Sequence, residues 1–388
     1  MLNCLAKNIL IGMIVTALLT GMALTTMAAD FPSQPQLKEG VKIRLGYLEG
    51  GPFPNYPPNL TAFVQGLAEF GWLEPPNIPE FSDPADAKSV WEWLADNAKS
   101  KHLVFVRNGF YSESWDKQLR STTKEQLIER LGSKPDIDFM IAMGTWAGQD
   151  LANDKHNVAT MVFSSSDPIG SKIIKSPEDS GFTHLHARVD PTRYERQVRL
   201  FHDILGFQKL GVAYEDSSEG RTYAAINDIR KVANQQGFEV VECYTKNGTP
   251  DIEEANTSVN KCHVELADKV QALYITNQTG VNNKNMPAMM APLFDKQIPT
   301  FSQPGSSLVK LGAMMSIAQA GFKYVGEFHA QIAGQIFNGA KPGSLPQVFE
   351  DPPKISLNLE SATRVGYNPS VEILVAADEV FKTIEQPK

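Results

Sequence analysis

The chain has 388 residues, of which 42% are hydrophobic and 21% are charged, with 28 glycines, 25 prolines and three cysteines. This composition excludes collagen-like, low-complexity and disulfide-framework proteins, and the length suits two hydrophobic cores better than one. The formal net charge is -8 at pH 7, and no cluster of basic residues offsets it. Nucleic acid and anionic membrane surfaces are therefore excluded as main partners.

The amino-terminal segment has the pattern of a targeting sequence. An apolar run over residues 9–24 follows Lys7, and small residues end it at Ala28 and Ala29. We predict a cleaved signal peptide over residues 1–29 and a mature protein in the periplasm or another extracytoplasmic space. The alternative is a retained membrane anchor, because the run is near the length that spans a bilayer.

Removal of this segment takes Cys4 with it and leaves Cys243 and Cys262 in an oxidising compartment. A disulfide between these two would close a loop of about 20 residues and add roughly 3 kcal/mol to the free energy of unfolding. We favour this disulfide over two reduced buried thiols. The spacing of the cysteines does not match a zinc site.

Strand and helix patterns alternate along the first half of the mature chain. Strands are predicted at residues 41–48, 103–106, 139–143 and 158–163. A helix is predicted over residues 59–70, where apolar residues recur at helical spacing before Gly71. The proline-rich segment 74–100 interrupts the alternation. We interpret it as an insertion packed on its own domain, with a cover over a cleft as the alternative.

The alternation restarts after Pro168. Helices are predicted from Asp190 to Gly206, over residues 220–236, up to Lys269 and over residues 322–337, and strands at residues 210–214, 238–243, 272–275, 298–301, 313–317 and 355–359. Strand, helix, strand order indicates parallel sheets. We predict an α/β protein with two doubly wound, mainly parallel, Rossmann-like lobes. Ligands of such sheets bind at the carboxyl ends of the strands, and a cleft between two domains is the usual site.

Motifs of common enzyme classes are absent. The sequence contains no P-loop, G-x-G-x-x-G, H-E-x-x-H or G-x-S-x-G motif. His184 and His186 alternate in a predicted strand, but no third metal ligand is evident, so we interpret them as strand histidines. We expect no catalytic residue, no cofactor and no metal.

Polar side chains follow the predicted strands just before the next helix. Hydroxyls, amides and carboxylates at these places suit a small polar ligand, although single members also fit helix caps and turns. Aromatic side chains nearby would supply a stacking wall. The predicted ligand-binding residues are Phe53, Tyr56, Thr145, Trp146, Ser165, Asp167, Tyr214, Glu219, Asn277, Gln278 and Gln303.

Several of these segments resemble the substrate-binding proteins of ABC transporters, of the tryptophan/tyrosine-type family. The resemblance runs from Val41 to Gly366, and its most specific parts are Asp167-Pro168 and the N-L-x-x-A-x-x-x-G run from Asn358. It implies the type I periplasmic binding protein fold, in which two lobes close about a hinge on a ligand. It also implies a small polar or aromatic ligand, amino-acid-like or a derivative, and an ABC permease as partner. We expect a monomer.

The resemblance also implies three crossovers between the lobes, which we place near Ser165, Ile298 and Gly343. The first lobe would then comprise residues 41–165 and 298–342, and the second lobe residues 166–297 and 343–388.

Two amides depart from the family pattern. The family commonly has an aspartate where this chain has Gln278, and an acidic residue is usual near Gln303 and Ser306. In amino-acid binders those acids would pair with a ligand ammonium group. A buried ammonium group without an anion is costly, so a free α-amino acid is disfavoured. Glu219 could compensate, or the ligand could be neutral, amide-bearing or anionic.

Two other functions stay open. A sensory binding protein that reports its ligand to a membrane kinase or cyclase would share these features, and neighbouring genes for a permease and an ATPase would separate the two. A periplasmic enzyme would need a nucleophile and a general base in the cleft, and no histidine lies at the strand ends named above.

Overall fold

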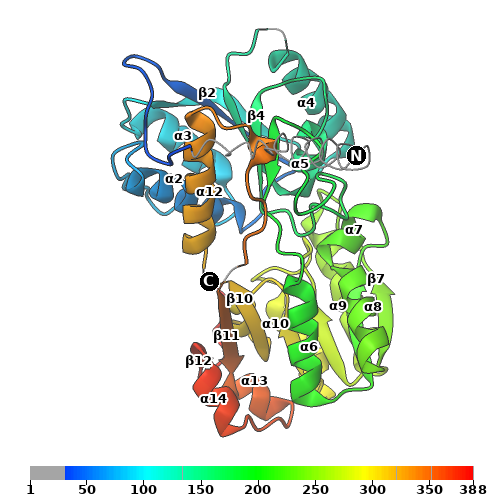
Figure 1. Cartoon of the computed structure of the whole chain (residues 1–388). Helices are drawn as coiled ribbons and strands as arrows, with labels where there is room; N and C mark the ends of the chain where they lie inside the picture. Colours follow the sequence, from blue (N-terminus) through cyan, green and yellow to red (C-terminus); the bar gives the residue numbers. More distant parts are fainter. Residues whose placement is uncertain (1–30, 133, 320, 351, 388) are drawn as a thin grey trace, which may run out of the picture. The chain divides into compact units, whose positions relative to one another are not determined.

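The computed structural model describes residues 31–132, 134–319, 321–350 and 352–387. The predicted signal peptide lies outside these residues. Within them, strands form two sheets with helices on both faces, which confirms the predicted α/β fold class (Figure 1). No helix in the described ranges is long and apolar enough to cross a membrane.

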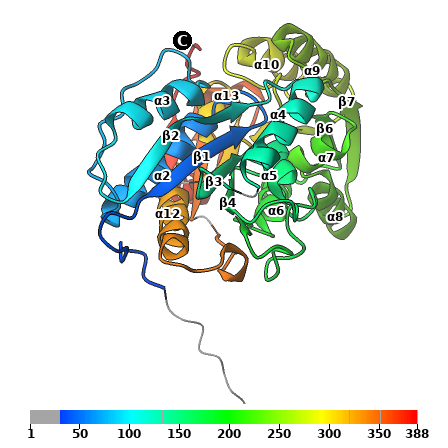
Figure 2. The same cartoon turned by 90° about the horizontal axis from the view of Figure 1, so that it is seen from above.

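The first sheet has five parallel strands in the order β2-β1-β3-β4-β5, of which Figure 2 labels β1 to β4. Their bounds are Ile43–Glu49 (β1), Leu103–Ser112 (β2), Phe139–Met143 (β3), Ala159–Phe163 (β4) and Leu185–Ala187 (β5). Side chains alternate between its two faces, so that Leu45 and Tyr47 enter one core and Leu48 enters the other. Both faces are therefore buried, as expected for a parallel sheet.

Helices from distant parts of the sequence cover the first sheet. Helices α2 (Tyr56–Glu69), α3 (Ala87–Asn97) and α12 (Lys323–Phe337) pack on one face, and α4 (Lys117–Arg130) and α5 (Gly144–Leu151) pack on the other. The close contact between α2 and α12 depends on two glycines. A Cβ at Gly326 would lie 2.5 Å from the backbone carbon of Ala62, and one at Gly66 would lie 2.8 Å from the Cβ of Ala330.

The second sheet has seven strands in the order β12-β11-β10-β9-β8-β6-β7. Their bounds are Lys209–Tyr214 (β6), Glu239–Tyr244 (β7), Ala272–Ile275 (β8), Thr300–Ser302 (β9), Met315–Gln319 (β10), Pro353–Asn358 (β11) and Glu379–Phe381 (β12). Only the pair β10 and β11 is antiparallel among these strands. The sheet is mainly parallel, as predicted.

Helices also cover both faces of the second sheet. Helices α6 (Arg193–Leu205), α8 (Ile226–Gln236) and α13 (Leu359–Arg364) contribute to one core, and α9 (Ile252–Ala267), α10 (Met286–Asp295) and α11 (Ser306–Lys310) contribute to the other. The remaining helices are α7 (Ser218–Tyr223), η1 (Pro342–Ser344) and α14 (Val371–Ala376). Helix α6 ends where Gly206 adopts a left-handed conformation at φ 64°.

The chain passes between the sheets at places that differ from the predicted crossovers. Strand β5 pairs with β4, so the first passage follows Ala187 and not Ser165. Strands β9 and β10 belong to the second sheet, so the second passage lies between Gln319 and Lys323 and not near Ile298. The third passage, between η1 and β11, lies close to the predicted position at Gly343. The position of each passage depends on which strands pair with one another, and the hydrophobic periodicity of a single strand does not reveal its neighbour in the sheet.

Cys243 of β7 and Cys262 of α9 form the disulfide that we favoured from the sequence. Their Cα atoms are 5.6 Å apart. The bond joins an edge strand of the second sheet to a helix on its face.

The segment 74–100 packs on its own sheet. Trp91 of α3 is fully buried in the core beside β2, and its indole N–H donates to the carbonyl oxygen of Val106 at 3.0 Å. Trp93 packs against the same core. The interpretation as an insertion, and not as a cover over the cleft, agrees with this packing.

Candidate functional site

A cavity lies at the carboxyl ends of strands from both sheets. Its volume is about 100 Å³, on a measure by which one water molecule needs about 10–15 Å³, so it has room for a small molecule. The lining residues are Phe53, Asn55, Tyr56, Asn59, Trp115, Thr145, Ser164, Ser165, Ser166, Arg188, Arg193, Tyr194, Tyr223, Asn247, Asn277, Gln278, Thr279, Pro304, Phe322 and Val325. They follow β1 to β5 in the first sheet and β6 to β9 in the second, or begin α6 and α12.

Six of the predicted ligand-binding residues line this cavity. They are Phe53, Tyr56, Thr145, Ser165, Asn277 and Gln278. Thr145 and Ser165 follow neighbouring strands, and their hydroxyl oxygens are 3.3 Å apart. The rings of Phe53 and Tyr56 pack with centroids 5.4 Å apart. The rule that parallel strands place their carboxyl ends at one edge of a sheet brings these residues together.

The amide of Gln278 is already engaged within the protein. Its nitrogen donates to the carbonyl oxygen of Ala213 and to the hydroxyl of Thr276, at 2.9 Å each. Its oxygen accepts from the hydroxyl of Thr245. Gln278 therefore shapes the wall of the cavity, and its hydrogen-bonding groups hold neighbouring strands together.

Gln303 does not line the cavity, because it is fully buried behind two residues that do. Its side-chain oxygen accepts from the backbone N–H of Asn277 at 2.8 Å, and its nitrogen donates to the backbone oxygen of Tyr223 at 2.8 Å. Gln303 thus joins the end of α7 to the segment that follows β8 through its two amide atoms.

Four more predicted residues lie outside the lining. Trp146 packs edge-on against Trp115, with centroids 5.5 Å apart. Asp167 accepts from the N–H of Gly170 and stabilises a turn. Tyr214 points into the core and donates to Glu242, and Glu219 lies in the first turn of α7. Caps, turns and core contacts explain these positions, as the alternative interpretation of such residues allowed.

Trp115 lines the cavity but was not among the predicted residues. Strand β2 continues to Ser112, beyond its predicted end at residue 106, and therefore carries Trp115 to the same edge. Trp115 has a left-handed φ of 57°, and its indole N–H donates to the oxygen of Pro52 at 3.0 Å. A Cβ at Gly51 would lie 2.6 Å from the ring, so this ring requires glycine there. The adjacent aromatic residues Phe110 and Tyr111, which favour strands, were the available signal.

Tyr223, Arg193 and Tyr194 were also missed. The predicted helix 220–236 is broken at Ala225, which has a left-handed φ of 53°, and this break leaves Tyr223 at the cavity. Arg193 and Tyr194 begin α6. The Asp-Pro pair before them predicted the start of the helix, and that start could have been included with the strand ends.

Two amide side chains at the cavity have oxygen atoms without a hydrogen-bond partner among the described residues. They belong to Asn59, which is 4% exposed, and to Asn277. Buried polar atoms are normally hydrogen-bonded, and an unpaired one costs about 1–3 kcal/mol. A polar ligand would provide the missing partners.

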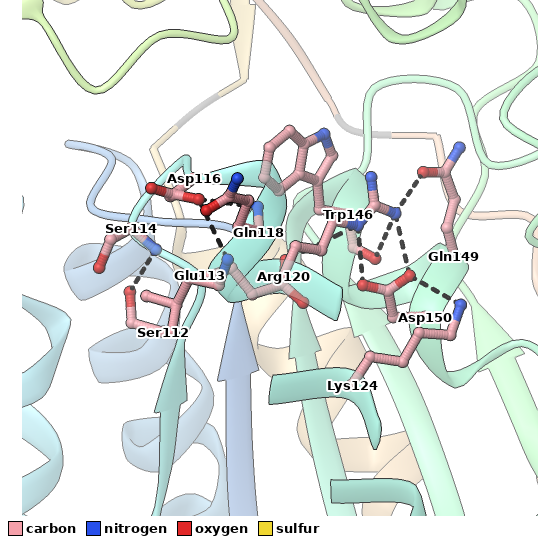
Figure 3. Close-up of polar contacts among 11 residues, drawn as sticks. Ser112, Glu113, Ser114, Asp116, Gln118, Arg120, Lys124, Trp146, Gln149 and Asp150 are labelled. Atoms are coloured by element: carbon pink, nitrogen blue, oxygen red, sulfur yellow. Dashed lines mark hydrogen bonds and ion pairs between the residues drawn. The ribbon is translucent and has the colours of Figure 1, made fainter. Parts of the chain in front are cut away.

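Charged residues pack against Trp146, which in turn packs against the lining residue Trp115. Figure 3 shows Arg120 between Trp146 and Asp150. The Arg120 guanidinium lies 4.6 Å from the Trp146 ring centroid and donates to Asp150 at 2.8 Å, and Lys124 donates to Asp150 at 3.1 Å. Burial opposes ionisation of Asp150, but its hydrogen bonds with Arg120 and Glu113 and the positive charges of Arg120 and Lys124 together outweigh burial and lower its pKa.

Two buried glutamates lie beside this group at the carboxyl ends of β1 and β2. Glu113 is fully buried, and burial together with the adjacent Asp150 carboxylate raises its pKa well above the usual range. Burial also raises the pKa of Glu49 to about 7, although Ser112 and Tyr47 donate hydrogen bonds to it. Neither glutamate lines the cavity. The raised pKa of Glu113 favours its uncharged form, which limits the negative charge beside the site.

The histidines that the sequence singled out are structural. The His184 ring packs on His156, with centroids 4.6 Å apart, and the His186 ring lies 2.9 Å from the carbonyl oxygen of Pro346 through Nε2. Burial lowers the pKa of His186 to about 4. Among the described residues, no group of three or more potential ligands could hold a metal ion.

The chain is similar in structure to several solved proteins. One is an ABC domain in complex with L-Trp from Streptococcus pneumonia, with 18% identity, coverage of 87% of this chain and 100% of that chain, and a TM-score of 0.64. Another is a conserved domain protein from Vibrio cholerae, with 18% identity, coverage of 87% and 99%, and a TM-score of 0.65. A ligand-free, open substrate-binding protein with adhesive properties from Clostridium difficile has 18% identity, coverage of 88% and 100%, and a TM-score of 0.58. A search of curated proteins found no match.

At these identities the structural neighbours establish the fold alone, which is that of the type I periplasmic binding proteins. The sequence adds the family. The model of the family described as ABC transporter substrate binding protein matches residues 116–381, which is more than half of the chain. The chain belongs to this family, and the resemblance identified from the sequence is confirmed.

Proposed function

We propose that the protein captures a small polar or aromatic molecule in an extracytoplasmic compartment and delivers it to the permease of an ABC importer. One observation carries the proposal, namely a cavity lined from the strand ends of both sheets. A ligand that contacts both sides favours the arrangement in which both contacts are made, and this differential affinity is what drives closure.

The two lobes in this proposal follow the sheets. One lobe comprises residues 43–187 and 323–348, and the other comprises residues 193–319 and 353–381, with the three connecting segments as the hinge. Each lobe has its own pair of hydrophobic cores, and rigid lobes with a short hinge are the usual basis of closure around a ligand.

The chemistry of the lining supports a ligand with both flat and polar parts. Aromatic rings from Phe53, Trp115, Tyr194 and Phe322 face the cavity from different elements. The amide oxygens of Asn59 and Asn277, which have no hydrogen-bond partner in the described part of the chain, would supply polar contacts between these rings. Concave sites with apolar walls and a few placed polar groups are typical of small-molecule receptors.

Binding can be tested directly on the chain that begins at Asp30. Native mass spectrometry of the purified protein should reveal a co-purified ligand, and a thermal titration across amino acids, carboxylates and nucleosides should find compounds that raise the melting temperature. Small-angle scattering should show a smaller radius of gyration with ligand. A panel in which no compound binds, together with protein that carries no ligand, would contradict the proposal.

Asn277 provides a mutational test. Asn277→Ala removes a lining amide and should weaken binding of the identified ligand about tenfold, which corresponds to ~1.4 kcal/mol. The matched control is Asn97→Ala, because Asn97 lies at the end of α3 and does not line the cavity. Equal affinity of both variants and the unchanged protein would remove Asn277 from the site.

The role in transport needs a separate measurement. Ligand-loaded protein should stimulate ATP hydrolysis by its permease and ATPase in proteoliposomes. Binding without stimulation would favour the sensory alternative.

A further inference from the structure

The charged residues that line the cavity, within the described part of the chain, are all arginines. Arg188 and Arg193 both line it, and no aspartate or glutamate of the described residues does. This contrasts with a chain whose net charge is -8. We propose that the ligand is a small organic anion, a carboxylate with a flat apolar part and no ammonium group. The inference rests on the proposed function and concerns the same cavity.

Arg193 is the residue that we expect to bind the carboxylate of the ligand. It is half-buried at the first position of α6, with its guanidinium 5.3 Å from the Tyr194 ring centroid. Other arginines of the same helix are paired with carboxylates, since Arg196 contacts Asp190 at 2.8 Å and Arg199 contacts Glu195 at 3.3 Å. Arg193 has no such ion pair within the described part of the chain. A planar guanidinium beside an aromatic ring is well suited to hold a carboxylate through two hydrogen bonds.

Carboxylates near the cavity have other roles. Asp190 binds Arg196, and Asp167 accepts from the N–H of Gly170. Glu219 lies close enough to act on Tyr223 electrostatically, but it does not line the cavity. Among the described lining residues, a ligand ammonium group would therefore meet only neutral acceptors, such as the amide oxygens of Asn59 and Asn277. Neutral acceptors can bind a hydroxyl or an amide N–H, but they do not balance a buried positive charge, which is expensive to desolvate.

Aromatic residues define the rest of the ligand. The rings of Phe53, Tyr56 and Trp115 enter from the first sheet, and those of Tyr194 and Tyr223 enter from the second. Flat apolar groups pack well against such rings, which also favour offset or edge-on stacking. A ring that carries a short carboxylate chain would satisfy both the aromatic walls and Arg193.

Compounds that share a ring but differ in charge separate the effect of the charge on affinity from the effect of the ring. Calorimetric titration at pH 7 would compare 3-phenylpropionate, phenylalanine and phenethylamine, and then indole-3-propionate, tryptophan and tryptamine. The carboxylate should bind at least tenfold more tightly than the zwitterion, and the amine should not bind. A zwitterion or amine that binds as tightly as its carboxylate would overturn the inference while leaving the proposed function intact.

If none of the six compounds binds, native mass spectrometry of the co-purified ligand shows whether the ligand is an acid without an amine. An acid without an amine supports the inference, and an amine or amino acid overturns it. If no ligand co-purifies and no compound of the wider panel binds, the proposed function fails as well.

Variants of α6 test the role of Arg193. Arg193→Gln should weaken binding of the best carboxylate at least tenfold but change the affinity for its neutral amide, for example 3-phenylpropanamide, by less than threefold. Arg199→Gln is the control, because Arg199 lies on the same helix and pairs with Glu195 away from the cavity. Equal losses for the carboxylate and the amide, or no loss for either, would overturn the assignment of Arg193.

Discussion

Gln303 lies behind the cavity, where its amide joins the backbones of Tyr223 and Asn277. Gln303→Ala removes both hydrogen bonds and leaves the half-buried N–H of Asn277 without its partner. We expect the free energy of unfolding to fall by about 1–3 kcal/mol, measured by urea denaturation. Gln118→Ala is the control, because Gln118 is exposed on α4. A loss no larger than that of the control would contradict the positioning role of Gln303.

Glu49 makes the stability of the protein depend on pH. Burial raises its pKa from 4.5 to about 7 in the folded protein, so the folded state binds a proton more tightly than the unfolded chain. The contribution is fully present below about pH 4.5 and is lost as the pH rises through about 7, and it amounts to about 3 kcal/mol.

Glu49→Gln should remove this pH dependence. The difference in the free energy of unfolding between the variant and the unchanged protein should shift by up to about 3 kcal/mol in favour of the variant between pH 4.5 and pH 7, because glutamine stays uncharged. The exposed Glu80 provides the control as Glu80→Gln, for which the same difference should be flat. A flat difference for Glu49→Gln would show that this carboxylate is ionised without cost.

Residues at the cavity differ in how readily the sequence indicates them. Thr145 and Ser165 directly follow apolar strands, and the geometry of parallel strands then places them at the site. Trp146 comes one residue after Thr145, so the helical turn directs its ring behind the wall against Trp115. Gln303 follows a strand in the same way, but it is buried and its amide is bonded to Asn277 and Tyr223. Burial and hydrogen-bond partners depend on tertiary packing, and only they distinguish a residue that lines the cavity from one that supports the lining.

At the level of elements, the contact between α2 and α12 depends on Gly326. Alanine usually stabilises a helix by up to ~1 kcal/mol relative to glycine. At Gly326, however, a Cβ would lie 2.6 Å from the backbone oxygen of Ala62, so the helices would have to move apart. Gly326→Ala should therefore lower the free energy of unfolding by about 1–3 kcal/mol.

Thermal and urea unfolding of Gly326→Ala can be compared with Gly248→Ala. A Cβ at Gly248 would have its nearest neighbour at an ordinary 3.6 Å. A stabilised Gly326→Ala variant would mean that helix propensity outweighs the contact.

The positions of most strands in the sequence were predictable, but the neighbours of each strand in the sheets were not. The apolar pattern predicts strands close to β3, β4, β6 and β8, because buried parallel strands are short and continuously hydrophobic. Strand β5 has only three residues, and β9 and β10 show nothing in their own sequence that assigns them to one sheet or the other. Two of the three predicted crossovers were displaced for this reason.

At the scale of the whole molecule, the tryptophans, whose fluorescence can be followed during unfolding, and the disulfide lie at different sheets. All five tryptophans precede residue 147, and those in the core lie beside the first sheet. The disulfide between Cys243 and Cys262 lies on the second sheet. Tryptophan fluorescence therefore reports on the first lobe, whereas far-UV circular dichroism reports on both.

Removal of the disulfide should separate these two signals. In the Cys243→Ser, Cys262→Ser double variant, the stability of the second lobe should fall by roughly 3 kcal/mol on the chain-entropy model. The dichroism transition should then begin at lower temperature, while the fluorescence transition shifts less. Equal shifts of both signals would show that the two lobes unfold as one unit.

Arg188 and Arg193 lie on either side of the segment that leads from β5 of the first sheet to α6 of the second. In the proposed receptor this segment is one of the three hinge connections, and an anion held by Arg193 would sit at its end. Recognition of charge and bending of the hinge would then share the same few residues. For anyone who adapts this protein as a biosensor, a change of ligand charge at these arginines would also change the size of the optical response, so selectivity and signal would have to be tuned together.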